Sequence, residues 1–273
     1  MAAFKKHIGI ILLVFVALGA AANNPVIENH KLSFVFNHLI AISDVNITPN
    51  KVAEYNQDFL YTVASFKQKK EKWNNDYRTL YHVFYKTHHK YLKEYKPIES
   101  FGRMLKYGEY GCLTGTALYA LILDELDYNF EIVETNYHVY ILIKTEDQEF
   151  LFESTDPMYG FYSSEKDINK KLTKDGSNEG KIFKNSIEFT FDLDNRIGLN
   201  ELIGLQYYNM AVQSYNKGFL IQSISELNEA ANYYNSERLK VFLNLILQEF
   251  NQEMQDVILE KQEFANLHKI AAL

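Results

Sequence analysis

The 273-residue sequence is poor in residues that cross-link or interrupt regular structure, with one cysteine, four prolines and twelve glycines. One cysteine excludes an internal disulfide framework, and so little Gly and Pro argues against a collagen-like chain or a loop-rich β-sandwich. A net charge of −7 disfavours nucleic acid as a partner, because phosphate binding needs clustered Lys and Arg. With 47% hydrophobic and 23% charged residues, a disordered chain and a polytopic membrane protein are also excluded. The 20 tyrosines and 19 phenylalanines instead favour long helices with aromatic packing.

The first 22 residues have the pattern of an export signal. Lys5 and Lys6 precede an apolar run over residues 7–22 that contains no Asp, Glu, Lys or Arg and ends in small residues. We therefore predict cleavage near Asn23 and a periplasmic or secreted protein. The alternative is an uncleaved membrane anchor, although the run is short for a span of about 20 residues.

Helical and strand patterns succeed one another along the chain and predict an α+β fold. We expect an α+β domain over residues 23–195, with a connector at 99–111 and a mobile polar loop at 170–184, and a helical module over 196–273. Aromatic residues recurring at helical spacing are interpreted as core packing. The predicted helices cover residues 51–70, 75–95 and 113–126, and the predicted strands cover residues 129–134, 138–144, 149–154 and 187–192.

The C-terminal residues 207–235 resemble a tetratricopeptide repeat. Ala211, Ser223, Leu227 and Ala230 supply the small and apolar contacts that such a repeat has between its paired helices, and Gly218 falls at the expected turn. One repeat cannot stand alone, so we expect it to pack on the preceding domain and to be able to dock a protein partner. An unspecialised helical hairpin is the other interpretation.

Cys112, the single cysteine, has three possible interpretations: a buried inert thiol, a disulfide to another chain, or a reactive group. Cys112 opens a predicted helix, where the dipole and free N–H groups favour a thiolate and can stabilise an oxyanion. Gly111 before it leaves room for a substrate to approach. His138, at the start of a predicted strand, can exchange a proton with the thiol, and acids that could orient it follow at Glu153 and Asp156.

Cysteine at a helix start, histidine on a following strand and an acid ending the next strand resemble the transglutaminase-like superfamily of papain-fold cysteine enzymes. The resemblance extends over residues 77–160 and is carried by Gly111-Cys112, the sequence YHVY at 137–140 and the sequence FLFESTDP at 150–157. It implies a papain-like core of a central helix on an antiparallel sheet. It also implies a Cys-His-Asp triad that transfers acyl groups from amides through a thioester, with no metal and no other cofactor.

The identity of the acid depends on the turn between the last two strands of this motif. A two- or four-residue loop pairs Tyr140 with Glu153 and puts Glu153 on the His138 face, whereas a three-residue loop pairs His138 with Asp156. The family pattern of Asp followed by Pro favours Asp156, whereas the sequence EST at 153–155 resembles a family strand end with Glu in the acid position. We prefer Asp156. Tyr110 and Asn136 are candidates for a side chain that assists the oxyanion.

We therefore expect an exported enzyme that hydrolyses protein or peptide amides or transfers their acyl groups. Cys112 would be the nucleophile, His138 the general base and acid, and Asp156 or Glu153 the orienting acid. A rival function is a catalytically inactive domain that serves as a binding scaffold through its helical module. His82, His88 and His89 lack the i, i+4 spacing of a helical metal site, so we interpret them as packing or solvated residues.

Overall fold

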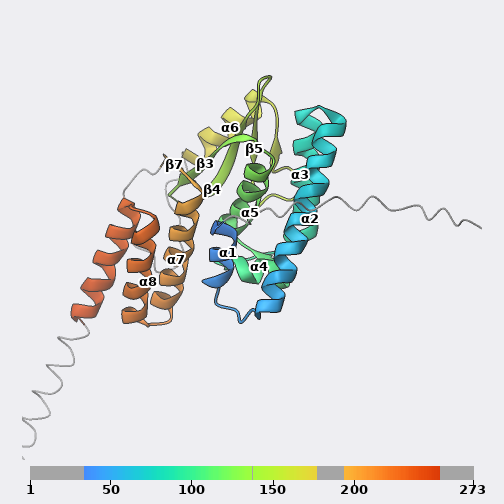
Figure 1. Ribbon diagram of the computed structural model, residues 1–273. Coiled ribbons are helices and arrows are strands. Elements are labelled where there is room, and N and C mark those ends of the chain that lie inside the picture. The colour runs from blue at the N-terminus through green and yellow to red at the C-terminus, as the bar shows by residue number, and fades with distance from the viewer. Residues whose placement is uncertain (1–33, 137, 177–193, 253–273) are drawn as a thin grey trace, which may run out of the picture.

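The computed structural model describes residues 34–136, 138–176 and 194–252 (Figure 1). The predicted export signal, the predicted strand at 187–192 and the end of the helical module lie outside these residues. Within the described ranges, no helix is both long enough and apolar enough to cross a membrane. The fold is mixed α+β, as the sequence predicted.

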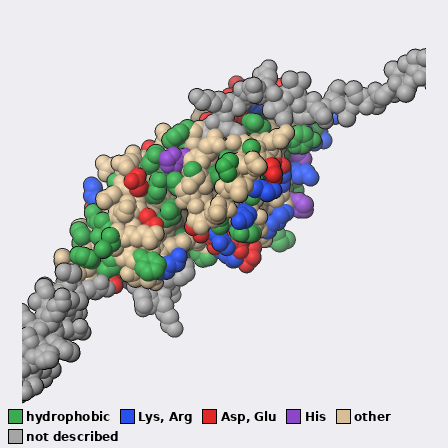
Figure 2. All heavy atoms as spheres, turned by 60° about the horizontal axis from the view of Figure 1, so that its bottom comes forward, with side chains coloured by type: hydrophobic (Ala, Val, Ile, Leu, Met, Phe, Trp, Pro, Cys, Tyr) green, Lys and Arg blue, Asp and Glu red, His purple; other side chains and the backbone are tan. Residues whose placement is uncertain are grey.

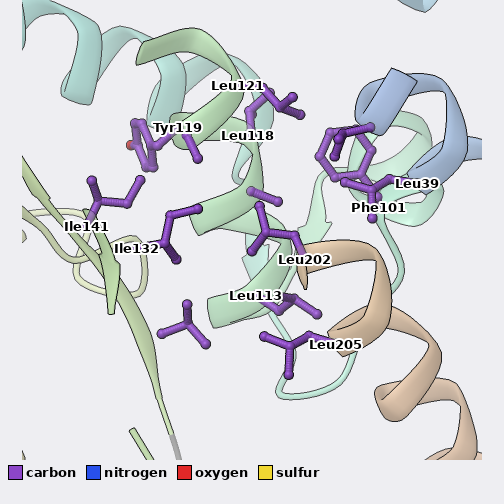
Figure 3. Close-up of a cluster of buried hydrophobic side chains, with 14 of the residues drawn as sticks. Leu39, Phe101, Leu113, Leu118, Tyr119, Leu121, Ile132, Ile141, Leu202 and Leu205 are labelled. Atoms are coloured by element: carbon purple, nitrogen blue, oxygen red, sulfur yellow. The ribbon is translucent and has the colours of Figure 1, made fainter. Parts of the chain in front are cut away.

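A single helix, α5 (Cys112–Glu125), forms the centre of the molecule. All but its ends are buried, because its sequence is apolar on every side. Figure 3 shows α5 between the sheet on one side and helices from both ends of the chain on the other. The surrounding side chains are Ile132 and Ile141 of the sheet, Leu202 and Leu205 of α7 (Leu199–Asn216), Leu39 of α1 (Phe34–Ala41) and Phe101 of α4 (Phe101–Tyr107).

The sheet has five antiparallel strands in the order β6-β5-β4-β3-β7. Its two faces follow the alternation of the strands: one packs on α5, and the other packs on α6 (Glu165–Gly176). The register pairs Ile141 with Phe152, which leaves a four-residue turn over 145–148. The strands are β3 (Asn129–Thr135), β4 (Val139–Lys144), β5 (Glu149–Phe152), β6 (Phe161–Tyr162) and β7 (Asp194–Ile197).

The expectation of a loop over 170–184 is wrong for its first seven residues, which belong to α6. Ile168 and Leu172 lie one helical turn apart, and both pack against the outer face of the sheet. This burial stabilises a helix that the surrounding Lys and Asp residues did not indicate. The remainder of the predicted loop lies outside the described residues.

Two long helices, α2 (Pro49–Trp73) and α3 (Asp76–Tyr91), pack against each other, and in Figure 1 they lie on the opposite side of α5 from the C-terminal helices. The aromatic residues that recur at helical spacing along α3 are only partly in the core, because Tyr77 and Tyr81 remain about half exposed. The connector predicted at 99–111 is more ordered than expected. It contains α4 (Phe101–Tyr107) and β2 (Glu109–Tyr110), and β2 pairs in parallel with β1 (Glu94–Tyr95).

The C-terminal residues are helical, as predicted, in α7 (Leu199–Asn216), α8 (Leu220–Tyr233) and residues 237–252. Gly218 lies at the turn between α7 and α8 with φ 78°, and the Ser223 hydroxyl donates to the Ala211 carbonyl at 2.7 Å. The predicted boundary at 195/196 falls inside β7. Helix α7 packs against α5 and α1, so both predicted domains contribute to one core.

Candidate functional site

Cys112 is the first residue of α5, and its side chain is partly exposed. The helix begins there because the Thr114 hydroxyl accepts a hydrogen bond from the Gly111 N–H at 2.9 Å. A Cβ atom on Gly111 would lie 2.8 Å from the Pro97 carbonyl oxygen and 3.0 Å from that of Lys96. The glycine therefore makes room for the preceding segment of the chain.

His138 lies one residue before β4, and its backbone is tied to the end of β3. Its carbonyl accepts from the Thr135 N–H at 2.8 Å, and its N–H donates to the Thr135 hydroxyl at 3.2 Å. The imidazole Nε2 lies 2.5 Å from Oε2 of Glu153, and the Cys112 side chain is close enough to the ring to raise its pKa. The imidazole therefore interacts with both the thiol and the carboxylate.

Glu153 follows β5 directly and is only 2% exposed. Its Oε1 accepts from the backbone N–H of Thr155 at 3.1 Å and from the Thr155 hydroxyl at 2.7 Å. Its Oε2 contacts His138 and also Nζ of Lys171, at 3.1 Å. Both carboxylate oxygens therefore have protein partners, which fixes the plane of the carboxylate towards the imidazole.

The sheet register explains why Glu153, and not Asp156, contacts the imidazole. The register ends at the Ile141–Phe152 pair and, continued by one step, puts Glu153 opposite Tyr140, as expected for a four-residue turn. Asp156 instead caps a local turn, because its Oδ1 accepts from the N–H groups of Met158 at 3.1 Å and Tyr159 at 2.8 Å. The preference for Asp156 as the orienting acid is therefore corrected to Glu153.

Two buried hydroxyl groups fix the start of α5 against the strand ends that carry His138 and Glu153. The Thr116 hydroxyl donates to the Val139 carbonyl at 2.9 Å, and the Ser154 hydroxyl donates to the Cys112 carbonyl at 3.3 Å. Gly115 permits this approach, because a Cβ atom there would lie 2.8 Å from Cβ of Ser154. The spacing of the three site residues is thus set by packing and not by flexible loops.

The charges of the site stabilise each other. Burial alone would lower the pKa of His138, but its hydrogen bonds to Cys112 and Glu153, together with their charges, raise it to about 10. Burial alone would raise the pKa of Glu153, but the hydrogen bond and charge of His138 and the charge of Lys171 lower it to about 2. An imidazolium held between a carboxylate and a thiol is therefore favoured across neutral pH.

One of the two residues proposed to assist an oxyanion is engaged elsewhere. The Tyr110 hydroxyl lies 3.3 Å from Nε2 of His88 in a buried pair, whereas the contact of Asn136 with Arg238, at 3.0 Å, uses its backbone carbonyl. Tyr95, which the sequence did not single out, pairs with Tyr110 across β1 and β2. Burial, followed by the charges of Cys112 and Glu153, raises the pKa of its hydroxyl. The sequence did not indicate Tyr95 because its place depends on the pairing of β1 with β2, which are distant in sequence.

Lys171 is the second site residue that the sequence did not indicate, because it lies in the segment predicted to be a loop. The expected packing role of the histidines fits their contacts: His82 packs edge-on against Phe66 and Trp73, and His88 is buried beside Tyr110. In the part of the chain that the structure describes, no cluster of His, Cys, Asp and Glu is arranged to hold a metal ion.

Taken together, the site has a thiol at a helix N-terminus, an imidazole that interacts with it and a buried carboxylate in contact with the imidazole. These are the groups of nucleophilic catalysis, in which a base activates the nucleophile and an acid orients the base. Searches with the whole chain against protein-family models, curated proteins and solved structures found no match.

Proposed function

We propose that this protein is an exported cysteine enzyme of the transglutaminase-like type, which transfers or hydrolyses acyl groups of protein or peptide amides. The observation that carries the proposal is the contact of 2.5 Å between His138 Nε2 and Glu153 Oε2, on an imidazole whose pKa the Cys112 side chain also raises. Support for the fold comes from a buried helix that begins at the thiol and packs on an antiparallel sheet. Support for export is the N-terminal sequence pattern.

The reaction would begin with attack of the Cys112 thiolate on the carbonyl carbon of the amide. The oxygen of the tetrahedral intermediate would be stabilised by N–H groups in the first turn of α5. His138 would donate its proton to the leaving nitrogen, which releases an amine and leaves a thioester on the sulfur. Water or a second amine would then attack the thioester, and His138 would accept the proton and restore the starting state.

The test uses the fact that Cys112 is the only cysteine, so that alkylation reports on one sulfur. We expect iodoacetamide to alkylate the wild-type protein at pH 6 at least ~10-fold faster than His138→Ala, because the imidazolium stabilises the thiolate. His89→Ala, which removes an exposed imidazole on α3, is the matched control and should leave the alkylation rate unchanged. Cys112→Ala should take up no label.

Two results would contradict the proposal. One is an equal rate for the wild-type protein and His138→Ala at pH 6. The other is a wild-type alkylation rate that rises with pH as for an ordinary thiol, with the midpoint of the rate–pH curve at about 8.5.

A binding scaffold is the second candidate, because hydrophobic side chains are exposed on the C-terminal helices. Phe219, Ile221 and Leu247 are all exposed there, and Figure 2 shows hydrophobic side chains gathered near this end of the molecule. Such residues can form part of a protein-binding surface. A scaffold without catalysis predicts that Cys112 reactivity does not depend on His138. An interchain disulfide through Cys112 predicts a dimer on a non-reducing gel.

A further inference from the structure

Arg238, from the helical residues 237–252, contacts the turn that leads from β3 to His138. Its guanidinium donates to the Thr135 carbonyl at 2.7 Å and to the Asn136 carbonyl at 3.0 Å. Two carbonyls held by one planar cation are fixed in position and in direction. The C-terminal helices are therefore bonded directly to the segment that carries the imidazole.

Only one residue separates this contact from His138. Thr135 accepts from Arg238 through its carbonyl, and its N–H and hydroxyl are both bonded to the His138 backbone, at 2.8 Å and 3.2 Å. A shift of the Thr135 peptide would therefore shift the backbone of His138 with it.

Arg238 is itself held by a buried carboxylate. Its side chain is 14% exposed, and its Nε lies 3.0 Å from Oε1 of Glu134, which is fully buried. The Tyr234 hydroxyl donates to the other oxygen of Glu134, and it accepts from the Asn195 amide at 3.1 Å. The ring of Tyr208 lies 5.4 Å from the guanidinium. The cation thus has partners from β3, from the residue after it and from α7.

A buried ion pair is costly to form and is weak support for stability as such. It does specify one arrangement, because a guanidinium that moved away would leave the buried Glu134 side chain without a cation partner. This arrangement determines where the turn before His138 lies relative to the helices.

We infer that Arg238 is a positioning residue for His138, so that the C-terminal helices hold the imidazole in register with Cys112. This inference rests on the proposed function. It gives the helical module a role within the active site, in addition to any role in docking a partner. Arg238 acts through the Thr135–Asn136 turn and does not touch the reacting atoms.

The test compares the pH dependence of Cys112 alkylation by iodoacetamide in the wild-type protein and in Arg238→Met. We expect about a 10-fold lower rate at pH 6 and a midpoint moved to higher pH, because a misplaced imidazolium stabilises the thiolate less. Arg238→Lys keeps the charge and should restore part of the rate. The control on the same helix is Lys240→Met, which removes an exposed ion pair to Glu237 and should change nothing.

Because Arg238→Met leaves Glu134 unpaired and could unfold the protein, the double variant Glu134→Gln/Arg238→Met removes both charges. We expect this variant to fold, by circular dichroism, and still to show the altered alkylation profile. If both variants fold and alkylate as the wild-type protein does, the inference is overturned while the proposed function stands. If the wild-type protein and His138→Ala alkylate equally, the proposed function fails and this inference fails with it.

Discussion

Glu153→Gln is the substitution that most directly tests the electrostatics of the site. Glutamine keeps the shape of the side chain and an oxygen for the Thr155 N–H, but it removes the negative charge beside His138. We expect the variant to fold and to be less stable than the wild-type protein at pH 6. The loss of stability should depend on pH, because Glu153 and His138 both titrate.

The expected size follows from the pKa of Glu153, which the folded protein lowers from 4.5 to about 2. At ~1.4 kcal/mol per pH unit, this corresponds to about 3 kcal/mol of stability at most. A lowered carboxyl pKa stabilises the fold above pH 4.5, and the stabilisation is lost as the pH falls towards about 2. The pKa of His138 is raised instead, so its contribution is complete below pH 6.5 and is lost as the pH rises through about 10. The difference in unfolding free energy between the wild-type protein and Glu153→Gln should therefore be largest between pH 4.5 and 6.5.

The measurement is urea unfolding of both proteins, followed by circular dichroism, from pH 3 to pH 8. Asp156→Asn is the matched control, because asparagine keeps the oxygen that caps the turn at Met158 and Tyr159. We expect this control to lie within ~0.5 kcal/mol of the wild-type protein. Equal stability of Glu153→Gln and the wild-type protein at pH 6, or a larger loss for Asp156→Asn, would refute the assignment of the carboxylate.

Two further predictions concern the surroundings of the site. Gly111→Ala should destabilise the protein by about 2 kcal/mol in thermal unfolding, because the added Cβ meets a backbone oxygen at 2.8 Å. Gly198→Ala, at the start of α7, is its control and should cost less, since only a flexible carboxylate lies close; equal losses would count against this packing argument. Lys171→Met should raise the pKa of Glu153, so that stability measured by urea unfolding falls at a higher pH on acidification. An exposed neighbour, Lys170→Met, should leave that curve unchanged, and an unchanged curve for both variants would contradict a role for the ion pair.

The central helix and the strands beside it could be predicted because their patterns are long and strongly apolar. The register could not, because it depends on whether the turn after Lys144 has two, three or four residues. That length is fixed by a local contact, in which the Thr145 N–H and hydroxyl both donate to the Gln148 carbonyl. The preference for Asp156 over Glu153 rested on a family pattern, and the four-residue turn favours the other acid.

Other parts of the site were hidden for different physical reasons. Strands of two residues, such as β1 and β2, are too short for any periodicity, so the pairing of Tyr95 with Tyr110 could not be predicted. Helix α6 depends on two apolar residues meeting the sheet, and this contact is tertiary. Arg238 lies 103 residues from the Thr135 carbonyl it binds, and one arginine on a polar helix carries no pattern of its own.

The position of β7 at the edge of the sheet has a consequence for the order in which the molecule assembles. A chain emerging from its amino end delivers Cys112, His138 and Glu153 well before residues 194–205, which close the sheet against β3 and bring Leu202 and Leu205 to α5. Until those residues arrive, β3 lacks its outer neighbour and α5 is uncovered along one side. The thiol therefore acquires its finished surroundings late, when most of the polypeptide has already emerged.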